Sequence, residues 1–540
     1  MNLDLLIFII YLISVFAVGI VVSYKQKGEY DDYFLAGRNL TWWVIGGSII
    51  AANISTHHFI GMAGQGVTVG LAIASYEWLA AIALILYGKF FLPYYLKERI
   101  TTMPEFLEKR FNYQVRLGFS VLSLIGYIFI ELAVVLYTGS LAIESLFGLP
   151  LGYGLTILCI IAGGYTIYGG LEAVAYTDVL QVTVLIVGGM AVTILGLIKV
   201  GEVSPGYTGN VLGGVNAILT ESPDKFEMVK SWNHPELPWI GVFFGGLWLA
   251  NIFYWGCNQF ITQKTLAAKD IWHGRMGVVF AGYLKLLVPF LVVLPGIIAF
   301  HLYDSEVGLL KSEAVLDKAD LAFPILVEQL LPNGISGLVM AGLMGAVMST
   351  IASLLNSSST IFTFDIYKRH FNIEANNKTL IRYGRYTIVS VLIIATIFGY
   401  FLQNLPAIFT YIQKFWSLAW PAISAIFIAG FFYPRANAKG CLVAIILGPL
   451  WAIGFMVAGS YQLVPELAFL NRAAIDFIFC SLLIWWFRTK GDSIPKKAII
   501  DRQFSQEVSK YIQKIPWYSN FTFWSFLLIG LIVILYIKFF

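Results

Sequence analysis

Long apolar segments recur along the whole chain and limit what it can fold into. The chain has 540 residues, of which 58% are hydrophobic and only 12% charged, whereas a soluble domain is about 25% charged. A helix needs about 20 apolar residues to cross a bilayer. About 14 segments meet this condition, at roughly 4–23, 42–67, 71–95, 117–144, 150–169, 175–199, 238–262, 275–301, 336–366, 382–402, 406–432, 438–459, 467–487 and 519–538. We therefore expect an all-α polytopic membrane protein.

The basic residues predict the orientation of these helices. Lys and Arg accumulate in cytoplasmic loops, and most of the chain's 35 basic residues fall into alternate loops, for example Lys97, Arg99, Lys368 and Lys497. No basic residue precedes the first apolar segment, so this segment does not have the pattern of a cleavable signal peptide. We expect a multi-pass plasma-membrane protein with both termini outside.

The second apolar segment is interrupted by a polar run. Residues 51–58 read AANISTHH, and such a run at membrane depth is tolerated only where it faces protein or a water-filled cavity. We expect the helix to break here, so that its freed backbone groups and polar side chains hold a solute and an ion. Because His57 and His58 are consecutive, at most one of them is expected to face a ligand. The segment 238–262 also carries Asn and Gly at mid-depth, as internal inverted repeats with broken first helices would.

Five charged residues stand out among those within the expected spans: Glu77, Glu131, Asp178, Lys285 and Lys414. Such charges are costly in a membrane and usually functional. Alternatively, these charges pair with one another or reach the membrane interface. These alternatives suit Asp178 and Lys414, which lie nearest to helix ends. Opposite charges near the midplane suit a ligand with many hydroxyls, because carboxylates accept and ammonium groups donate hydrogen bonds.

Hydroxyl and aromatic side chains add two further candidates. The run Ala346 to Ser353 is rich in hydroxyls, which in membrane helices mostly bond their own backbone but which also suit a sodium ion, together with carbonyls freed at the break. Asn251, Tyr254 and Trp255 lie together in the segment 238–262. They are either packing residues or an aromatic gate over a sugar ring.

Several functional classes lack sequence support. No HExxH, GxSxG or Walker motif is present, and the four cysteines do not have the spacing of metal ligands. We therefore expect no enzyme activity, no cofactor and no binding of nucleic acid.

Several runs are similar to those of a known family. They are Asp32 to Arg38, Ala51 to Ser55, Gly70 to Trp78, Gly245 to Gln259, Leu284 to Gly296 and Asn356 to Tyr367. The chain resembles the sodium/solute symporter family, most closely its bacterial sodium/galactose and animal sodium/glucose members. The resemblance implies a single transporter domain, 1–540, with the leucine-transporter-type fold. Its parts would be a leading helix (4–23), two inverted five-helix repeats (42–199 and 238–432) and three C-terminal helices (438–538).

The same resemblance implies which residues bind solute and ion. Sugar would be held by Asn53, Glu77, Asn251, Lys285 and Gln413. Tyr254 would close the inner side of the sugar site, with Tyr76 and Trp255 nearby. Sodium would be bound by the carbonyls of Ala51, Ile54 and Ala346 and the hydroxyls of Ser349 and Thr350.

The chain also departs from these relatives. His58 stands where the bacterial relative has Gln, and we include it among the sugar-binding candidates. Ala80 replaces a serine of the bacterial sugar site. Glu131 and Lys414 replace an Asn and a Glu, so they either pair with each other or leave Glu131 to bind sugar directly. Some relatives have a second sodium site that uses the Asp178 position and two serines. Here Ser353 is present but its neighbour is Ala352, which leaves one or two sodium ions open.

The sequence therefore predicts a sodium-coupled symporter that imports a neutral sugar by alternating access, with a monomer sufficient for transport. Coupling requires that sodium and sugar each tighten the binding of the other. Three alternatives remain. In the first, the solute is another polyol, a sugar acid or an amino acid. In the second, the chain is an ion channel. In the third, it is a transporter-like nutrient sensor, which would need a signalling domain or a dedicated partner.

Overall fold

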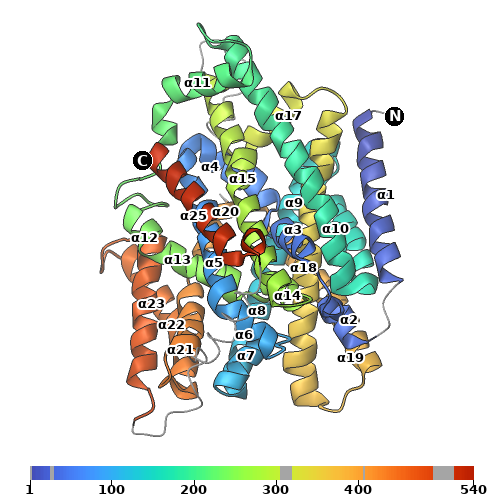
Figure 1. Ribbon diagram of the computed structural model, residues 1–540, viewed down its shortest axis with the longest axis vertical. Coiled ribbons are helices and arrows are strands. Elements are labelled where there is room, and N and C mark those ends of the chain that lie inside the picture. Colours follow the sequence, from blue (N-terminus) through green and yellow to red (C-terminus); the bar gives the residue numbers. More distant parts are fainter. Residues whose placement is uncertain (1–2, 25–28, 305–318, 405–407, 491–515) are drawn as a thin grey trace.

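The protein is a bundle of membrane-length helices. A computed structural model describes residues 3–24, 29–304, 319–404, 408–490 and 516–540 (Figure 1). These residues contain no β-strand beyond an isolated bridge between Leu40 and Ala268. Eleven helices in the described part are long and apolar enough to cross a membrane. Three further expected spans appear as shorter apolar helices, Trp42–Asn53, Leu151–Gly164 and Trp420–Phe432, which confirms the fold class and approximately matches the expected number of spans.

The helix boundaries follow the apolar segments closely. The spans that are single helices are α1 (Leu3–Ser23), α15 (Ile271–Asp304), α18 (Ile335–Ile361), α19 (Asn377–Tyr400), α22 (Ala438–Ser460), α23 (Phe469–Trp486) and α25 (Phe521–Lys538). The spans that are interrupted comprise α3 (Trp42–Asn53), α4 (Ala63–Thr68), α5 (Ser75–Leu86), α6 (Leu92–Lys97), α8 (Tyr113–Ile125), α9 (Ala133–Phe147), α12 (Trp239–Phe243), α13 (Gly246–Ile252), α14 (Gln259–Leu266), α20 (Ile408–Trp416) and α21 (Trp420–Phe432). Shorter connecting helices are α2 (Tyr30–Leu35), α7 (Met103–Arg110), α11 (Val211–Glu221) and α17 (Ala322–Leu330).

Some sequence predictions fall on residues outside this description. They concern the basic residue Lys497 and the first two residues of the expected span 406–432.

The expected helix break is present and has a counterpart. Helix α3 ends at Asn53, and Ile54 is extended, with φ −77° and ψ 116°; a π-helical turn, η2 (His58–Met62), then leads into α4. In the second case α13 continues as the π-helical turn η7 (Phe253–Cys257), and Asn258 is extended, with φ −83° and ψ 119°, before α14 begins. Nearly the same local conformation therefore interrupts both helices.

Helix α10 (Leu151–Val203) contains a kink where the sequence predicts a short loop at 170–174. The kink is at Gly170, with φ 54° and ψ −162°, a conformation that is essentially restricted to glycine. A Cβ atom there would lie 2.4 Å from the backbone oxygen of Tyr33. The two expected spans 150–169 and 175–199 thus meet at a sharp turn of the backbone.

Three long helices, α10, α15 and α18, pack against α3. Helix α10 packs against α3 and α18, and α15 packs against α3 and α5. Figure 1 shows α1 at one side of the bundle and α22 and α23 at the opposite side. The broken segment is therefore enclosed by long helices, as polar backbone at membrane depth requires.

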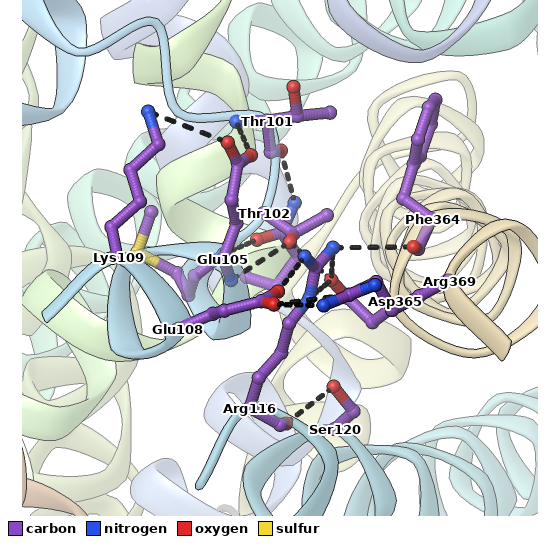
Figure 2. A network of polar contacts seen from close by, with 12 residues as sticks. Thr101, Thr102, Glu105, Glu108, Lys109, Arg116, Ser120, Phe364, Asp365 and Arg369 are labelled. Carbon is purple, nitrogen blue, oxygen red and sulfur yellow. Dashed lines mark hydrogen bonds and ion pairs between the residues drawn. The ribbon is translucent and has the colours of Figure 1, made fainter. Parts of the chain in front are cut away.

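A polar network joins α7 to the ends of two other helices. The carboxylate of Asp365, which is fully buried, accepts hydrogen bonds from Thr102 (2.8 Å) and from Nε of Arg116 (2.7 Å). Figure 2 shows Arg116 between Asp365 and Glu108, and Glu108 also accepts a hydrogen bond from Arg369 at 2.8 Å. The network ties α7 to α8 and to the π-helical turn η9 (Phe362–Phe371) that follows α18.

Candidate functional site

A cavity lies beside the break in α3. It has a volume of about 90 Å³, several times the space that one water molecule occupies. Its walls come from α3, α5, α13, α15, α20 and α21, from the π-helical turns next to the two breaks and from the π-helical turn η5 (Gly126–Leu132). Every residue expected to bind sugar or to form the gate lines this cavity: Asn53, His58, Tyr76, Glu77, Glu131, Asn251, Tyr254, Trp255, Lys285 and Gln413.

Lys285 connects three walls of the cavity. Its ammonium group is 1% exposed and donates hydrogen bonds to Oδ1 of Asn53 and Oε2 of Glu77. The same nitrogen lies 5.0 Å from the ring centroid of Trp255. A buried charge is costly unless it is paired and hydrogen-bonded, so Glu77 and Asn53 are the partners that allow Lys285 to remain in the bundle.

His58 links the break to this charge pair. Its Nε2 lies 3.7 Å from Oε1 of Glu77, and its Nδ1 accepts a hydrogen bond from the backbone amide of Ser55 at 3.3 Å. In an unbroken helix the Ser55 amide would bond the carbonyl of Ala51. The histidine therefore takes over that amide and releases the Ala51 carbonyl from its helical partner.

His57 lines the same cavity, and its ring contacts that of His58 in a tilted arrangement, with centroids 4.2 Å apart and an interplanar angle of 37°. The expectation that only one of the two consecutive histidines faces the ligand site is wrong. The reason is local, because the segment between the break and the π-helical turn does not have the side-chain directions of a regular α-helix.

The gate residues contact the break directly. Nδ2 of Asn53 donates a hydrogen bond to the hydroxyl of Tyr254 at 3.0 Å. The indole nitrogen of Trp255 donates to Oδ1 of Asn251 at 3.1 Å. The amide nitrogen of Asn251 is buried and has no hydrogen-bond partner within the described chain. A buried donor without a partner is costly, and this one lies in the cavity wall, where a solute would satisfy it.

Glu131 and Lys414 lie in different cavities. Lys414 is exposed and lines a second cavity together with Arg472, whereas Gln413, the preceding residue of α20, lines the first. No ion pair joins Glu131 to Lys414 in the part of the chain that the structure describes. The pairing alternative is therefore wrong, because Lys414 lines the second cavity, whereas Glu131, on the π-helical turn η5 (Gly126–Leu132), faces the solute cavity.

The cavity has further wall residues that sequence reasoning did not select. They are Leu247, Ala250, Phe253, Ile412, Trp416 and Trp420. Ala80, which replaces a serine of the bacterial sugar site, also lines the wall. Trp416 was accessible to prediction because it follows Gln413 by three residues and thus shares its helix face. The apolar residues carry no sequence signal that separates a cavity wall from ordinary packing.

The candidate sodium site lies where α18 crosses the end of α3. The hydroxyl oxygen of Thr350 is 3.0 Å from the carbonyl oxygens of both Ala52 and Ala346. The hydroxyl of Ser349 donates to Oδ1 of Asp178 at 2.6 Å. The predicted ligands Ala51, Ile54, Ala346, Ser349 and Thr350 are all buried at this crossing. The single hydroxyl hydrogen of Thr350 is thus shared between a carbonyl of its own helix and a carbonyl of the broken helix.

Comparison with known proteins identifies the family. The model of the sodium:solute symporter family matches residues 33–448. The chain belongs to the sodium:solute symporter family. It is 44% identical to a sodium/glucose cotransporter of Vibrio parahaemolyticus over 460 residues, which cover 82% of this chain and 83% of the relative. It is 35% identical to sodium/glucose cotransporter 1 of Ovis aries over 507 residues, 89% of this chain and 74% of the relative. As a member of this family the chain is a membrane transporter and not an enzyme.

Solved structures of two transporters share the fold. The chain superimposes on a Na⁺-coupled sialic acid symporter, in a substrate-bound outward-open state, with a TM-score of 0.78 and 24% identity, covering 90% of this chain and 97% of the other. A nucleobase-cation-symport-1 family transporter, Mhp1, gives a TM-score of 0.52 at 16% identity, covering 88% of this chain and 97% of the other. These likenesses confirm the expected leucine-transporter-type fold.

Proposed function

We propose that this symporter couples the inward movement of sodium to the uptake of a neutral sugar, a hexose such as galactose or glucose, across the plasma membrane. One observation carries the proposal: buried Lys285 bonds both Asn53, at the break, and Glu77 within a single cavity. Relatives named sodium/glucose cotransporters support a sugar as the solute.

The chemistry of the cavity favours a solute with many hydroxyls and no net charge. Carboxylates of Glu77 and Glu131 accept hydrogen bonds, while Lys285 and the amide of Asn251 donate them. Because Glu77 already neutralises Lys285, a carboxylate-bearing solute would meet the charge of Glu131 without a free cation to pair with. A sugar acid or an amino acid is therefore the less suitable occupant, and aromatic rings of Tyr254 and Trp255 offer apolar faces to a sugar ring.

The coupling follows from the neighbourhood of two ligand sites. Sodium would be bound by the carbonyls of Ala51, Ile54 and Ala346 and by the hydroxyls of Ser349 and Thr350. Sodium there would hold the end of α3 against α18, and Asn53, next to the Ala52 carbonyl that Thr350 contacts, would then be placed for sugar. Loss of sodium to the cytoplasm would loosen this crossing, so that Tyr254 leaves Asn53 and the sugar is released.

The same proposal includes the arrangement in the membrane. The distribution of basic residues favours an orientation with both termini outside. The extended residues Ile54 and Asn258 favour inverted repeats at 42–199 and 238–432, because they break helices at corresponding places of the two repeats. Each site is complete within one chain, so we expect a monomer to transport.

The test is uptake into proteoliposomes. The purified protein is reconstituted, an inward sodium gradient is imposed, and labelled hexoses, pentoses, inositols, a sugar acid and an amino acid are compared. We expect uptake of at least one hexose that requires the sodium gradient and is lost when potassium replaces sodium. Sodium-driven uptake of the acidic solutes alone would contradict the sugar assignment, and sodium current without any solute flux would indicate a channel.

A further inference from the structure

A second group of buried oxygen atoms lies beside the candidate sodium site, around Asp178. This carboxylate is fully buried and accepts hydrogen bonds from the hydroxyls of Ser48, on α3, and Ser349, on α18. The hydroxyl of Ser353 lies one helix turn beyond Ser349 and is also buried. A carboxylate with several hydroxyls is the kind of ligand set that a hard cation takes.

A cation of the chain itself occupies this group. Nζ of Lys264, on α14, lies 2.8 Å from the hydroxyl oxygen of Ser353 and 3.9 Å from Oδ2 of Asp178. It also donates a hydrogen bond to the backbone oxygen of Phe260 at 3.3 Å. The Lys264 side chain is 1% exposed, and a fully buried ammonium is strongly unfavourable without a counter-charge. Asp178 supplies that charge.

The neighbouring residue fixes Lys264 in place. The side-chain amide of Gln263 donates to the hydroxyl of Thr360 at 2.8 Å, and its oxygen accepts from the hydroxyl of Ser357 at 2.9 Å. Helix α14 is therefore docked on α18 along two successive residues. The ammonium cannot swing out of the group around Asp178 unless this docking is broken.

The ammonium and a sodium ion exclude each other at Asp178. They would carry the same charge and use the same oxygen atoms, and two like charges about 4 Å apart in a low-dielectric interior repel strongly. The oxygen atoms around Thr350 have no such internal cation among the described residues. The group around Asp178 is thus filled by the chain, and the oxygen atoms around Thr350 are left for an ion; Ser349, which bonds Asp178, lies between the two groups.

We propose that Lys264 is a tethered cation that fills a second cation site at Asp178, so that the protein binds one sodium ion per cycle. The site left by removal of the ammonium would take sodium, a monovalent hard cation that matches the carboxylate and hydroxyl ligands. The inference rests on the proposed sodium coupling, but the number of bound sodium ions is measurable without any sugar.

The experiment counts bound sodium. Radiolabelled sodium binding to the purified protein is measured at equilibrium for the wild type, Lys264→Ala and Lys264→Gln, with folding checked by thermal unfolding. We expect one ion per wild-type chain and two per chain in both variants, and a Hill coefficient for sodium-driven uptake that rises from 1 toward 2. Adding Asp178→Asn to Lys264→Ala should bring the count back below two, and Lys264→Arg, which keeps the charge, should bind one.

Two results would overturn the inference. One is a count of two bound sodium ions per chain in the wild type. The other is a count of one in Lys264 variants that remain folded, which would show that the Lys264–Asp178 pair only stabilises helix packing. Lys199→Ala is the matched control, because Lys199 is a surface lysine that pairs with Glu202 at 3.1 Å, and it should leave the count at one. If the wild type transports no sugar, the proposed function fails while the sodium count still decides this inference.

Discussion

The hydroxyl oxygen of Thr350 on α18 lies 3.0 Å from the carbonyl oxygen of Ala52, one residue before the last residue of α3. The next residue, Asn53, bonds both Lys285 and Tyr254 in the solute cavity. Two consecutive residues of the broken helix therefore contact the proposed ion site and the proposed sugar site. Any shift of this turn changes both sites at once, which is what reciprocal coupling between two ligands requires.

Thr350→Ala should raise the sodium concentration needed for half-maximal uptake. The variant loses one hydroxyl ligand and the bond to Ala52, and a hydrogen bond of this kind contributes about 1 kcal/mol, which is about fivefold in affinity. Sodium titration of sugar uptake in proteoliposomes measures the change. Thr350→Ser keeps the hydroxyl and should stay near the wild-type value. An unchanged sodium dependence in Thr350→Ala would place the ion elsewhere.

Lys285→Ala should abolish sugar uptake and destabilise the protein. Hydrogen bonds to a charged group contribute about 1.5–3 kcal/mol each, so loss of the ammonium should weaken sugar binding by about 10- to 100-fold. The variant also leaves Glu77 buried without its cation, and breaking such a pair costs about 3–5 kcal/mol. Sugar binding and thermal unfolding of the same sample measure the two effects.

The double variant Glu77→Gln/Lys285→Met separates the two roles of this pair. It removes both charges, so the unfolding temperature should recover relative to Lys285→Ala while sugar binding should not. Wild-type uptake in Lys285→Ala or in Glu77→Ala would show that the pair does not belong to the sugar site.

Sequence reasoning reached the position of the break because polar residues have few permitted places in a lipid-embedded helix. The run that ends in His57 and His58 marked the break, and the isolated charges Glu77 and Lys285 marked the cavity. The assignment of individual roles to Ser349 and Thr350 came from resemblance to a family, since a hydroxyl in a helix usually bonds its own backbone.

Other features needed the three-dimensional structure. The separation of Glu131 from Lys414 depends on which of the two cavities each side chain lines. The contact of Lys264 with Asp178 joins residues 86 positions apart on different helices, and nothing in the local sequence of either residue reports it. The sequence predicts a loop at the kink, because the pair Gly169 and Gly170 between two apolar segments does not distinguish a loop from a bend within one helix.

Tyr254→Phe should speed the release of sugar. The variant removes the hydroxyl that accepts a hydrogen bond from Asn53 at 3.0 Å, and the loss of about 1 kcal/mol corresponds to about a fivefold faster exchange. Counterflow of labelled sugar in sodium-equilibrated proteoliposomes measures this rate. Tyr536→Phe is the matched control, because that hydroxyl bonds Ser75 at 2.9 Å and Tyr536 does not line the cavity. Equal exchange rates in the two variants would remove Tyr254 from the gate.

Glu108→Gln should destabilise the α7 network in a pH-dependent way. Burial raises the pKa of Glu108, but hydrogen bonds and charge from Arg116 and Arg369 lower it by more, so the pKa lies below the ordinary value of 4.5. A depressed carboxyl pKa stabilises the fold at pH values above the ordinary pKa, and the contribution is lost as the pH falls through the depressed value. The group is partly exposed, so the effect at neutral pH should be at most about 1 kcal/mol.

Thermal unfolding of wild type and Glu108→Gln across a pH series tests this sign. The difference between the two proteins should be largest near neutral pH and should vanish only when the pH falls below the depressed pKa of Glu108, which lies below 4.5. A difference that grows toward acid would contradict the assigned direction.

Gly170→Ala should destabilise the protein, whereas Gly164→Ala in the same helix should not. At Gly170 the backbone has φ 54° and ψ −162°, and an added Cβ would lie 2.4 Å from the backbone oxygen of Tyr33. The strained conformation alone costs about 1–3 kcal/mol for a residue other than glycine, and the collision adds to it. At Gly164 an added Cβ meets no atom within 4 Å, and alanine is the better helix former by about 1 kcal/mol. Unfolding temperatures of the two variants in the same detergent should therefore move in opposite directions from the wild type, and an equal shift for both would show that the kink is not held by glycine at this position.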